Sequence, residues 1–438
     1  MILKESLKMI SLTSLRESKY LKNGIWLLLL QIFKVIAPLI TLPYITRILP
    51  VSTYGEFIIS LNWITYLQVL VEYGFELTGA QKIAVCSDNI IERSKVRSKI
   101  LFAQISLLLP SILLLTGIVL FSALKQTQLI CMSILFLGVF SVAFQQNWFF
   151  QGICEMQNIT LVNVIARSIS IILIFIFVKS ADDLYLYCIL FVSSSILSSI
   201  LGCIIAKKKY KLEIIIPNVH SILSELKDGW SLFTSSFLTR VFTNVGVTIL
   251  GFVALKEEVG AYAAIYKITF ILTILFSALS QSIYPQMCKV FSKSPLNNGI
   301  KNVIKIAVPV LTFFLFACIV LIFFRDYIVG IAFGSLYIPF AYLLVPFSVW
   351  TFFGILNNFL GIQILVASNH KKLYSTAFTI CVTSSLLLMF VLGSLNGVLG
   401  VALGSMFGEC ILTMVLLFFI KKLSRTISNE KSNACFRN

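Results

Sequence analysis

Long apolar runs alternate with short polar or charged segments along the whole chain of 438 residues. One helix needs about 20 apolar residues to cross a bilayer, and we count twelve runs of suitable length. The pattern therefore predicts an all-α polytopic membrane protein with twelve transmembrane helices. The least regular stretch is 325–345, where Phe333-Gly334 and Pro339 interrupt the apolar residues. The predicted spans are 23–48, 55–78, 100–122, 127–151, 159–178, 183–206, 229–253, 259–287, 302–324, 337–366, 372–392 and 397–420.

The composition excludes a soluble multidomain enzyme. Hydrophobic residues make up 58% of the chain and charged residues only 12%, with a mean hydropathy of +0.96. A soluble core does not need that much apolar surface, whereas a chain that crosses the bilayer many times does.

Positive charge is divided unequally between the segments that join the spans. Alternate segments, beginning with the N-terminal one, contain 25 lysines and arginines, and the segments between them contain five. Cytoplasmic loops carry the excess of these residues, so we expect both termini in the cytoplasm. The net charge of +17 is then explained by basic loops that keep the spans in their orientation across the membrane. Because the basic residues are dispersed between apolar spans, nucleic acid is not an expected partner.

Weak matches between the two halves indicate an internal repeat. Lys22-Asn23-Gly24 and Lys227-Asp228-Gly229 are 205 residues apart, as are Gly55 and Gly260. Two like-oriented halves imply an axis along the membrane normal and rocking of one half against the other. Chance matches among common residues are the alternative explanation. The predicted domains are a cytoplasmic N-terminal segment (1–22), an N-terminal six-helix lobe (23–206), a cytoplasmic linker (207–228), a C-terminal six-helix lobe (229–420) and a cytoplasmic tail (421–438).

The N-terminal segment 1–22 does not read as a cleaved signal peptide, because the apolar run that follows it is too long and lacks a small-residue cleavage site. Leu3, Leu7 and Ile10 share one helical face, so we expect this segment to lie on the inner membrane surface.

Six predicted spans carry polar residues at helical spacing, which indicates polar seams that meet around a common cavity. A charge inside a span is costly, at about 2.5–3.5 kcal/mol on insertion scales, and normally faces protein or water. Lys34 and Arg240 each fall about 15 Å into their spans, near the bilayer midplane. The seams are Gln31, Lys34, Pro38 and Thr41; Thr65, Gln68, Glu72 and Glu76; Thr160, Asn163, Arg167 and Ser170; Ser236, Arg240 and Thr243; Lys267, Ser277 and Gln281; and Ser405, Glu409 and Thr413.

The deep charges are mostly cationic, which predicts an anionic substrate. Buried cations without counter-charges are hard to maintain unless an anion enters the cavity, and both lysine and arginine suit phosphate. The alternative for any one of these residues is structural pairing with a carboxylate such as Glu72. The predicted substrate-binding cations are Lys34, Arg167, Arg240 and Lys267.

Glu72 and Glu409 are the acids within the spans that we consider for ion coupling. A desolvated carboxylate at the midplane can bind a proton, so Glu409 is a candidate for coupling transport to H⁺ or Na⁺. Packing of helices through hydrogen bonds explains it equally well.

The motifs of the common enzyme classes are absent from the sequence. There is no G-x-x-x-x-G-K-[ST] loop for ATP hydrolysis and no HExxH, GxSxG or zinc spacing. The ten cysteines form no CxxC pair, and His220 and His370 lie in basic loops. We therefore expect no cofactor, no metal site and no enzymatic activity.

Short motifs along nearly the whole chain resemble those of one family, the Wzx-type O-antigen and polysaccharide repeat-unit flippases of the multidrug/oligosaccharidyl-lipid/polysaccharide exporter superfamily. The chain departs from that pattern at Leu49-Pro50, where the family usually has Leu-Gly, and at Cys154, where an acidic residue is common. The matching residues are Gln31, Leu42-Pro43-Tyr44, Arg47, Tyr54-Gly55, Glu72-Tyr73-Gly74-Phe75, Trp148-Phe149-Phe150-Gln151-Gly152-Ile153, Glu155-Met156, Ile159-Thr160, Tyr284-Pro285, Phe333-Gly334, Tyr337, Gly397-x-x-Gly400 and Glu409.

The resemblance implies two six-helix lobes around a cationic central cavity. It implies translocation of undecaprenyl-diphosphate-linked oligosaccharide units from the cytoplasmic to the periplasmic leaflet of the bacterial inner membrane. The lipid-linked oligosaccharide and membrane lipid are then the expected partners, together with the polysaccharide polymerase and chain-length machinery.

Three other functions remain open at this stage. A flippase for the peptidoglycan lipid precursor would also need a cationic cavity. A cation-coupled multidrug exporter of the same superfamily should have an acidic cavity. A membrane glycosyltransferase or polymerase should have a large periplasmic loop, and no periplasmic loop here exceeds about a dozen residues.

Overall fold

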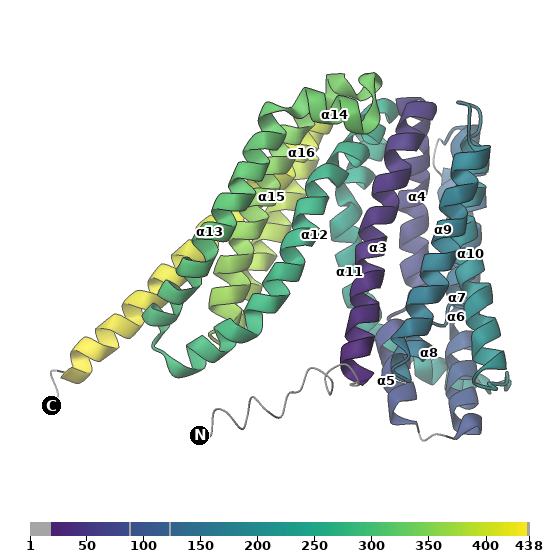
Figure 1. The fold of residues 1–438 in the computed structure, drawn as a ribbon, viewed down its shortest axis with the longest axis horizontal. Helices are drawn as coiled ribbons and strands as arrows, with labels where there is room; N and C mark the ends of the chain where they lie inside the picture. The colour runs from purple at the N-terminus through teal and green to yellow at the C-terminus, as the bar shows by residue number, and fades with distance from the viewer. Residues whose placement is uncertain (1–18, 87–88, 122–123, 436–438) are drawn as a thin grey trace. The chain divides into compact units, whose positions relative to one another are not determined.

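The fold is known from a computed structural model that describes residues 19–86, 89–121 and 124–435. All regular elements in these ranges are helices (Figure 1). The predicted surface helix around Leu3, Leu7 and Ile10 lies outside the described residues. The first helices are α3 (Lys19–Ile48), α4 (Val51–Glu72), α5 (Phe75–Val85), α6 (Ile90–Phe121), α7 (Gln126–Ala143), α8 (Asn147–Gly152), α9 (Met156–Phe177) and α10 (Leu184–Lys208). They are followed by α11 (Val219–Val253), α12 (Lys256–Lys293), α13 (Leu296–Phe323), α14 (Arg325–Phe333), the 3₁₀ helix η1 (Ser335–Leu343), α15 (Leu344–Asn358), the π-helix η2 (Phe359–Val366) and α16 (Lys371–Cys435).

The helices account for the twelve predicted spans, and the fold class is confirmed. Ten helical segments of the described chain are long and apolar enough to cross a membrane. The last of these, Lys371–Arg425, contains two spans, because the backbone leaves helical geometry at Asn396 and Gly397. These ten segments therefore provide eleven spans, and α4 provides the twelfth. α4 has 22 residues, which is long enough to cross a membrane, but it is more polar than the ten segments.

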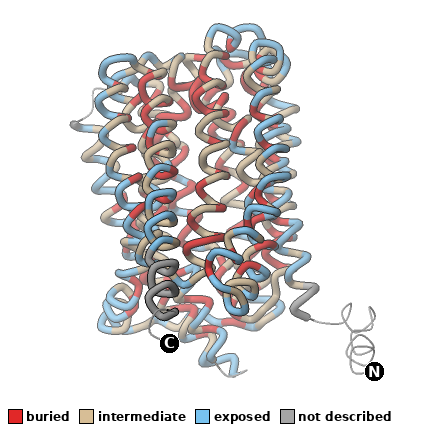
Figure 2. Tube along the Cα trace, turned by 90° about the vertical axis from the view of Figure 1, so that its left-hand side faces the viewer, coloured by how far each residue is buried: buried red, intermediate tan, exposed pale blue. Residues whose placement is uncertain are grey.

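Large apolar side chains lie exposed along many of these helices, as expected where lipid rather than water surrounds the protein. Examples are Phe316 and Phe323 on α13. Figure 2 shows exposed turns alternating with buried ones along the length of the helices. The buried positions pack helix against helix, and the exposed apolar positions are available to lipid.

The chain forms two compact units, and two helices contribute to both. The first unit contains the described residues up to Pro50 together with Glu56–Asn244, and the second contains Val51–Gly55 and the described residues from Val245 onward. α4 therefore begins in the second unit and continues in the first, while α11 passes from the first to the second at Asn244. The predicted lobe boundaries at 206 and 229 stay a prediction.

A sharp break separates α4 from α5, so the expectation of one continuous helix over 55–78 is wrong at its end. Tyr73 and Gly74 both adopt left-handed backbone geometry, with φ of 48° and 74°. This geometry is unfavourable for an L-residue such as tyrosine. The Tyr73 ring stacks on Phe233 of α11 at 4.7 Å between ring centroids. A Cβ on Gly74 would lie 2.8 Å from the Cβ of Leu232, so only glycine fits there.

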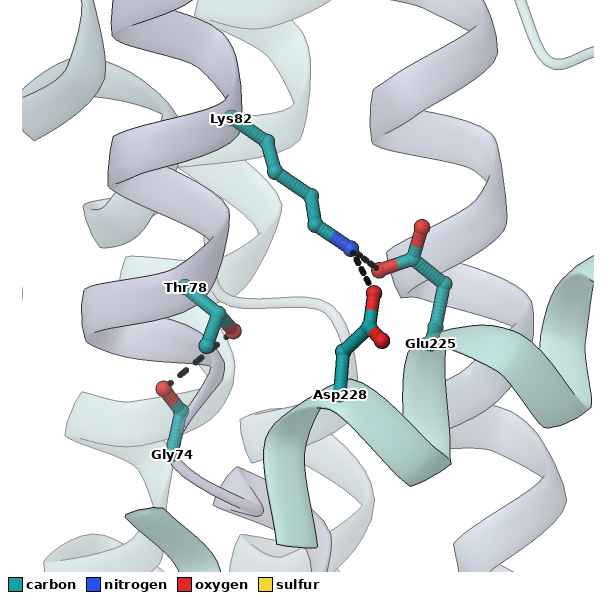
Figure 3. A network of polar contacts seen from close by, with 5 residues as sticks. All are labelled: Gly74, Thr78, Lys82, Glu225 and Asp228. Carbon is teal, nitrogen blue, oxygen red and sulfur yellow. Dashed lines mark hydrogen bonds and ion pairs between the residues drawn. The ribbon is translucent and has the colours of Figure 1, made fainter. Parts of the chain in front are cut away.

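An ion-pair network fixes the start of α11 against α5 within the first unit (Figure 3). The Lys82 ammonium lies 2.6 Å from a carboxylate oxygen of Glu225 and 3.0 Å from one of Asp228. The Glu225 side chain is only 9% exposed, compared with 31% for Lys82 and 55% for Asp228. Burial alone would lower the pKa of Lys82, but the hydrogen bonds and negative charge of the two carboxylates outweigh it and raise the pKa above its ordinary value of 10.5.

Glycines let the two halves of α16 pack backbone to backbone in the second unit. After Gly397, where φ is +54°, the chain returns along its preceding turns. A Cβ on Gly400 would meet the carbonyl of Leu392, one on Gly404 the backbone nitrogen of Met389 at 2.5 Å, and one on Gly408 the side chain of Ser385. The spacing of four residues places these three glycines on one face, which is the small-xxx-small pattern of membrane helix pairs.

The two glycines that match between the halves of the sequence meet in the structure. A Cβ on Gly55 would clash with the carbonyl of Lys256, and one on Gly260 would lie 2.5 Å from the carbonyl of Val51. Val51 and Lys256 are themselves 205 residues apart. The contact is therefore reciprocal, and the predicted repeat stays a prediction.

Replacing Gly404 by alanine should destabilise the fold, because a Cβ there forces the two halves of α16 apart. Overpacking of this kind typically costs about 1–3 kcal/mol. Gly354→Ala in α15 is the matched control, since no atom lies within 4 Å of its added Cβ and alanine favours a helix. Thermal unfolding of the two variants in the same membrane mimetic measures the difference. Equal melting temperatures would rule out close packing at Gly404.

Replacing Lys82 by glutamine should destabilise the first unit more than Asp228→Asn does. Lys82→Gln leaves the nearly buried Glu225 carboxylate without its cation, at a cost of roughly 1–2 kcal/mol for a partly exposed pair. Asp228 is more exposed and its loss should cost less than about 1 kcal/mol. Because the folded-state pKa of Lys82 is raised, its contribution should persist below pH 10.5 and disappear as pH rises through the raised value. Melting temperatures measured against pH check this; a pH profile above 10.5 identical in wild type and Lys82→Gln would contradict it.

Candidate functional site

A cavity of about 240 Å³ that is lined by both apolar and polar side chains lies between α3, α9 and α10 in the first unit. Lys34 of α3 and Arg167 of α9, two of the predicted substrate-binding cations, both line it. We call it the α3–α9–α10 cavity. The remaining lining residues are apolar, amide or hydroxyl side chains, and none is a carboxylate: Leu30, Phe33, Ala37, Pro38, Gln145, Asn163, Ser194, Ser195 and Ser198.

Neutral groups hold the polar side chains of this cavity in place. Arg167 donates to the hydroxyl of Ser194 at 3.3 Å, and its guanidinium lies 4.9 Å from the centre of the Phe191 ring. Ser198 donates to the Asn163 carbonyl oxygen at 3.2 Å, while the Asn163 amide nitrogen donates to the backbone oxygen of Ile159. Arg167 therefore keeps its positive charge uncompensated by any acid that lines the cavity.

Two of the other predicted residues, Arg240 and Lys34, act electrostatically on Glu72. Its carboxylate, near the end of α4, is attracted by Arg240 of α11 and more weakly by Lys34, and is repelled by Glu76 of α5. The structural pairing that the sequence left open for Glu72 stays a prediction. Arg240 and Lys34 are both exposed side chains, so neither is locked away from an incoming anion.

Lys267 lies in the second unit with different neighbours. Its ammonium is 3.2 Å from the hydroxyl of Tyr54 and 5.9 Å from the centre of the same ring. Tyr54 belongs to the turn that begins α4 and is almost fully buried. The structure therefore brings Lys34 and Arg167 to one cavity and places Arg240 and Lys34 within electrostatic range of Glu72. Lys267 has a separate position beside Tyr54.

Glu409 of α16 is held by a buried hydrogen-bond network that also lies in the second unit. The Asn357 amide nitrogen donates to a Glu409 carboxylate oxygen at 2.7 Å and to its backbone oxygen at 2.9 Å. Thr413 donates to the Asn357 side-chain oxygen at 2.7 Å. Asn357 immediately precedes Asn358 and the π-helix η2, an irregularity frequent at functional sites.

The hydroxyl residues of the predicted seams mostly bond within their own helices. Such bonds satisfy the hydroxyl inside the helix, so these residues contribute less to a cavity than their spacing suggested. The hydroxyls that donate to a carbonyl one turn earlier are those of Thr41, Thr65, Thr160, Thr243, Ser277, Ser405 and Thr413.

Several lining residues were missed from the sequence. Ser194, Ser195 and Ser198 lie on α10, and serines are too common in membrane helices to stand out. Gln145 lies just after α7, in a segment expected to be helical.

Asn357, the partner of Glu409, was also missed. Its sequence position gave a recognisable signal, because an amide in an apolar run needs a hydrogen-bonding partner.

The α3–α9–α10 cavity has the chemistry of an anion site with room for neutral polar groups. Arginine and lysine bind phosphate oxygens, and hydroxyl and amide side chains exchange hydrogen bonds with sugars or water. Its volume is below the range of about 300–1,000 Å³ typical for drug-sized ligands, so it fits one part of a larger molecule. Among the described residues, no group of three or more His, Cys, Asp or Glu side chains could hold a metal ion.

Two curated relatives indicate the kind of protein to which the chain is similar. A putative O-antigen transporter of Escherichia coli (strain K12) is 27% identical over 403 residues, covering 91% of this chain and 96% of the relative. A probable low-salt glycan biosynthesis flippase, Agl15 of Haloferax volcanii, is 27% identical over 187 residues, covering 41% and 39% of the two chains. Both names describe transporters and not enzymes, in line with the expectation from sequence.

Solved structures share the fold at low sequence identity. The lipid II flippase MurJ in an inward closed conformation has a TM-score of 0.67 at 17% identity, with 92% of this chain and 87% of that chain covered. An inward-facing multidrug resistance MATE family transporter has a TM-score of 0.64 at 13% identity, with coverages of 90% and 99%. These likenesses show that the chain shares the twelve-helix, two-lobe fold of those proteins.

A family model described as polysaccharide biosynthesis protein matches residues 20–291, which is more than half of the chain. The matched region includes the α3–α9–α10 cavity, the Glu72 cluster and Lys267. The resemblance predicted from the sequence motifs is thereby confirmed, and the chain belongs to the polysaccharide biosynthesis protein family.

Proposed function

We propose that this protein is a flippase that moves undecaprenyl-diphosphate-linked oligosaccharide repeat units, of O-antigen or a similar surface polysaccharide, across the bacterial inner membrane. The unit travels from the cytoplasmic to the periplasmic leaflet by alternating access. The proposal agrees with the family and with the names of the curated relatives.

The observation that carries the proposal is the α3–α9–α10 cavity, where Lys34 and Arg167 are accompanied by hydroxyl and amide groups and by no carboxylate. A diphosphate and its sugars cannot enter hydrocarbon unaided, because unpaired polar groups there cost several kcal/mol each. Cations compensate the phosphate charge, and serine and asparagine side chains replace water around hydroxyl groups. The polyprenyl tail needs no such shelter and stays in lipid.

The substrate-binding set consists of Lys34, Arg167, Arg240 and Lys267 in this proposal. Lys34 and Arg167 hold the diphosphate first, since they share one cavity. The Glu72 carboxylate attracts Arg240, and a phosphate competes with that carboxylate for the guanidinium. Lys267 interacts with Tyr54 and supplies a cation on α12 for a later stage of transport.

The topology belongs to the proposal as well. The excess of lysine and arginine in alternate loops supports cytoplasmic placement of both termini. Association with the polymerase and chain-length machinery follows from the need to consume the flipped unit in the periplasm.

The other candidate functions are less well supported. An exporter of organic cations needs an acidic binding site, whereas no carboxylate lines this cavity. A peptidoglycan precursor also carries a diphosphate, so the cavity does not separate it from a polysaccharide unit. The likeness to MurJ shows fold alone, whereas the family and the curated relatives favour polysaccharide units.

Deleting the gene should abolish the surface polysaccharide and leave lipid-linked repeat units in the cytoplasmic leaflet. Gel analysis of surface polysaccharide and mass spectrometry of extracted lipids measure the two effects. Accumulation of peptidoglycan precursor in place of repeat units would assign the other substrate, and an unchanged polysaccharide would refute both flippase functions.

Complementation of the deletion with Lys34→Gln or Arg167→Gln should restore little polysaccharide. Each change removes a charge-assisted interaction worth about 1.5–3 kcal/mol, which corresponds to roughly 10–100-fold weaker binding of the diphosphate. Lys34→Arg keeps the charge and should restore most of the polymer. Lys125→Gln removes an exposed lysine away from the cavity and serves as the control. Wild-type polymer with both cavity variants, at equal membrane abundance, would contradict the cation site.

Glu409→Gln should remove the dependence of transport on the proton or sodium gradient while keeping the fold. A glutamine oxygen still accepts the hydrogen bond from Asn357, so packing is preserved but no proton or cation site remains. Transport in reconstituted vesicles with and without an imposed gradient is the measurement, with Glu257→Gln in the first turn of α12 as the control. An unaltered response to both gradients would assign Glu409 to helix packing.

A further inference from the structure

A second cavity lies in the first unit, between α7 and α10, where apolar side chains such as Phe140 and Ile200 are exposed. Its volume is about 450 Å³, and almost all of its surface is apolar. We call it the α7–α10 groove. Two hydrogen bonds lie at its floor, from Ser199 to the backbone oxygen of Ser141 at 2.6 Å and from Cys203 to that of Phe144 at 3.3 Å. The lining residues are Leu137, Phe140, Ser141, Phe144, Ile196, Ser199, Ile200, Cys203 and Ile204.

One end of the groove is positively charged. The lining residues of α10 follow a stripe of three and four residue steps that ends at Ile204, and the next positions on this stripe are Lys207 and Lys208. Both lysines are exposed. Neither has an ion-pair partner within the described part of the chain, whereas the neighbouring Lys209 lies 3.6 Å from the Glu155 carboxylate.

A buried arginine adds to the charge at this end. Arg97 of α6 is only 4% exposed, and its Nε donates to the side-chain oxygen of Gln146 at 2.8 Å. Its guanidinium also interacts with Cys203, a wall residue of the groove. No carboxylate among the described residues pairs with it. A positive charge that is so poorly compensated favours an anion nearby.

We propose that the α7–α10 groove binds an anionic glycerophospholipid of the surrounding membrane, with an acyl chain along the groove and the phosphate at Lys207 and Lys208. An apolar trough that ends in cations at the membrane surface matches the two parts of such a lipid, and basic pockets between transmembrane helices commonly bind anionic headgroups. The bound lipid bridges α7 and α10 and thereby stabilises the helix that also lines the α3–α9–α10 cavity.

The geometry of α10 argues against the polyprenyl tail of a transported substrate as the occupant. Ser194 and Ser198 face the α3–α9–α10 cavity, while Ile196 and Ile200 face the groove. Residues two apart differ by about 200° around a helix, so the two sites lie on opposite sides of α10. A molecule with its diphosphate in one site would have to wrap around the helix to reach the other.

The test is native mass spectrometry of the full-length protein with phosphatidylglycerol or phosphatidylcholine added at equal concentration. Wild type should retain phosphatidylglycerol preferentially. Lys207→Gln/Lys208→Gln should weaken its binding by about 30-fold. Lys371→Gln/Lys372→Gln, a pair of adjacent exposed lysines at the start of α16, should leave it unchanged. Equal retention of the two lipids by wild type, or unchanged preference in the Lys207/Lys208 variant, would overturn the proposal.

A second variant tests the groove without changing charge. Ile200→Trp fills it and should reduce retention of phosphatidylglycerol, whereas Leu387→Trp on an exposed position of α16 should not. Wild-type melting temperatures in phosphatidylcholine vesicles would show that both variants fold. Unchanged retention with Ile200→Trp, or displacement of the phospholipid by undecaprenyl phosphate, would also overturn the assignment, the latter in favour of the substrate tail. None of these outcomes depends on polysaccharide transport, so the proposed function stands or fails separately.

Discussion

Close approach of helix backbones at glycine is the constraint on which this structure depends. Lipid is as apolar as leucine, so helices inside a membrane gain little from hydrophobic association and are held by tight packing and hydrogen bonds. At Gly55 and Gly260, at Gly74, and along Gly400, Gly404 and Gly408, an added Cβ would collide with backbone or a fixed side chain. The apolar residues that fill most of the sequence place the helices in the membrane. The glycines determine which helices can pack closely, and this packing determines which polar groups come into contact.

Charge inside the membrane is the second constraint, and the chain meets it in two ways. The Glu72 carboxylate attracts Arg240 and Lys34 on other helices, which favours the observed helix arrangement. Arg167 is surrounded by hydroxyl and aromatic groups without a carboxylate, which leaves its charge available. The same cost of desolvation thus favours attraction between opposite charges in one place and, in the proposed function, an anion site in another.

The spans could be predicted from sequence because the apolar runs are long and well separated, and the deep cations because a charge in such a run is conspicuous. The break at Tyr73-Gly74 could not, since it depends on contacts with Leu232 and Phe233 in a helix far along the chain. The serines of α10 and the partner of Glu409 were missed for a related reason. Small hydroxyls and neutral amides acquire a role only through the residues that they face. The grouping of Lys34 with Arg167 became visible only when α3 and α9 were seen to share a cavity.

The two faces of α10 differ: one lines the α3–α9–α10 cavity and the other lines the α7–α10 groove. This difference explains how one helix can face a polar headgroup and remain stable in lipid. Ser194 donates to a carbonyl of α10 itself, Ser199 to one of α7 and Ser198 to the Asn163 side chain of α9, so these three hydroxyls have protein partners. The opposite stripe of α10 is apolar and stays in contact with the membrane. A polar substrate can then enter on one side without exposing unsatisfied backbone on the other. In the proposed function, the attraction of a diphosphate to Lys34 and Arg167 is therefore not offset by a loss of helix stability.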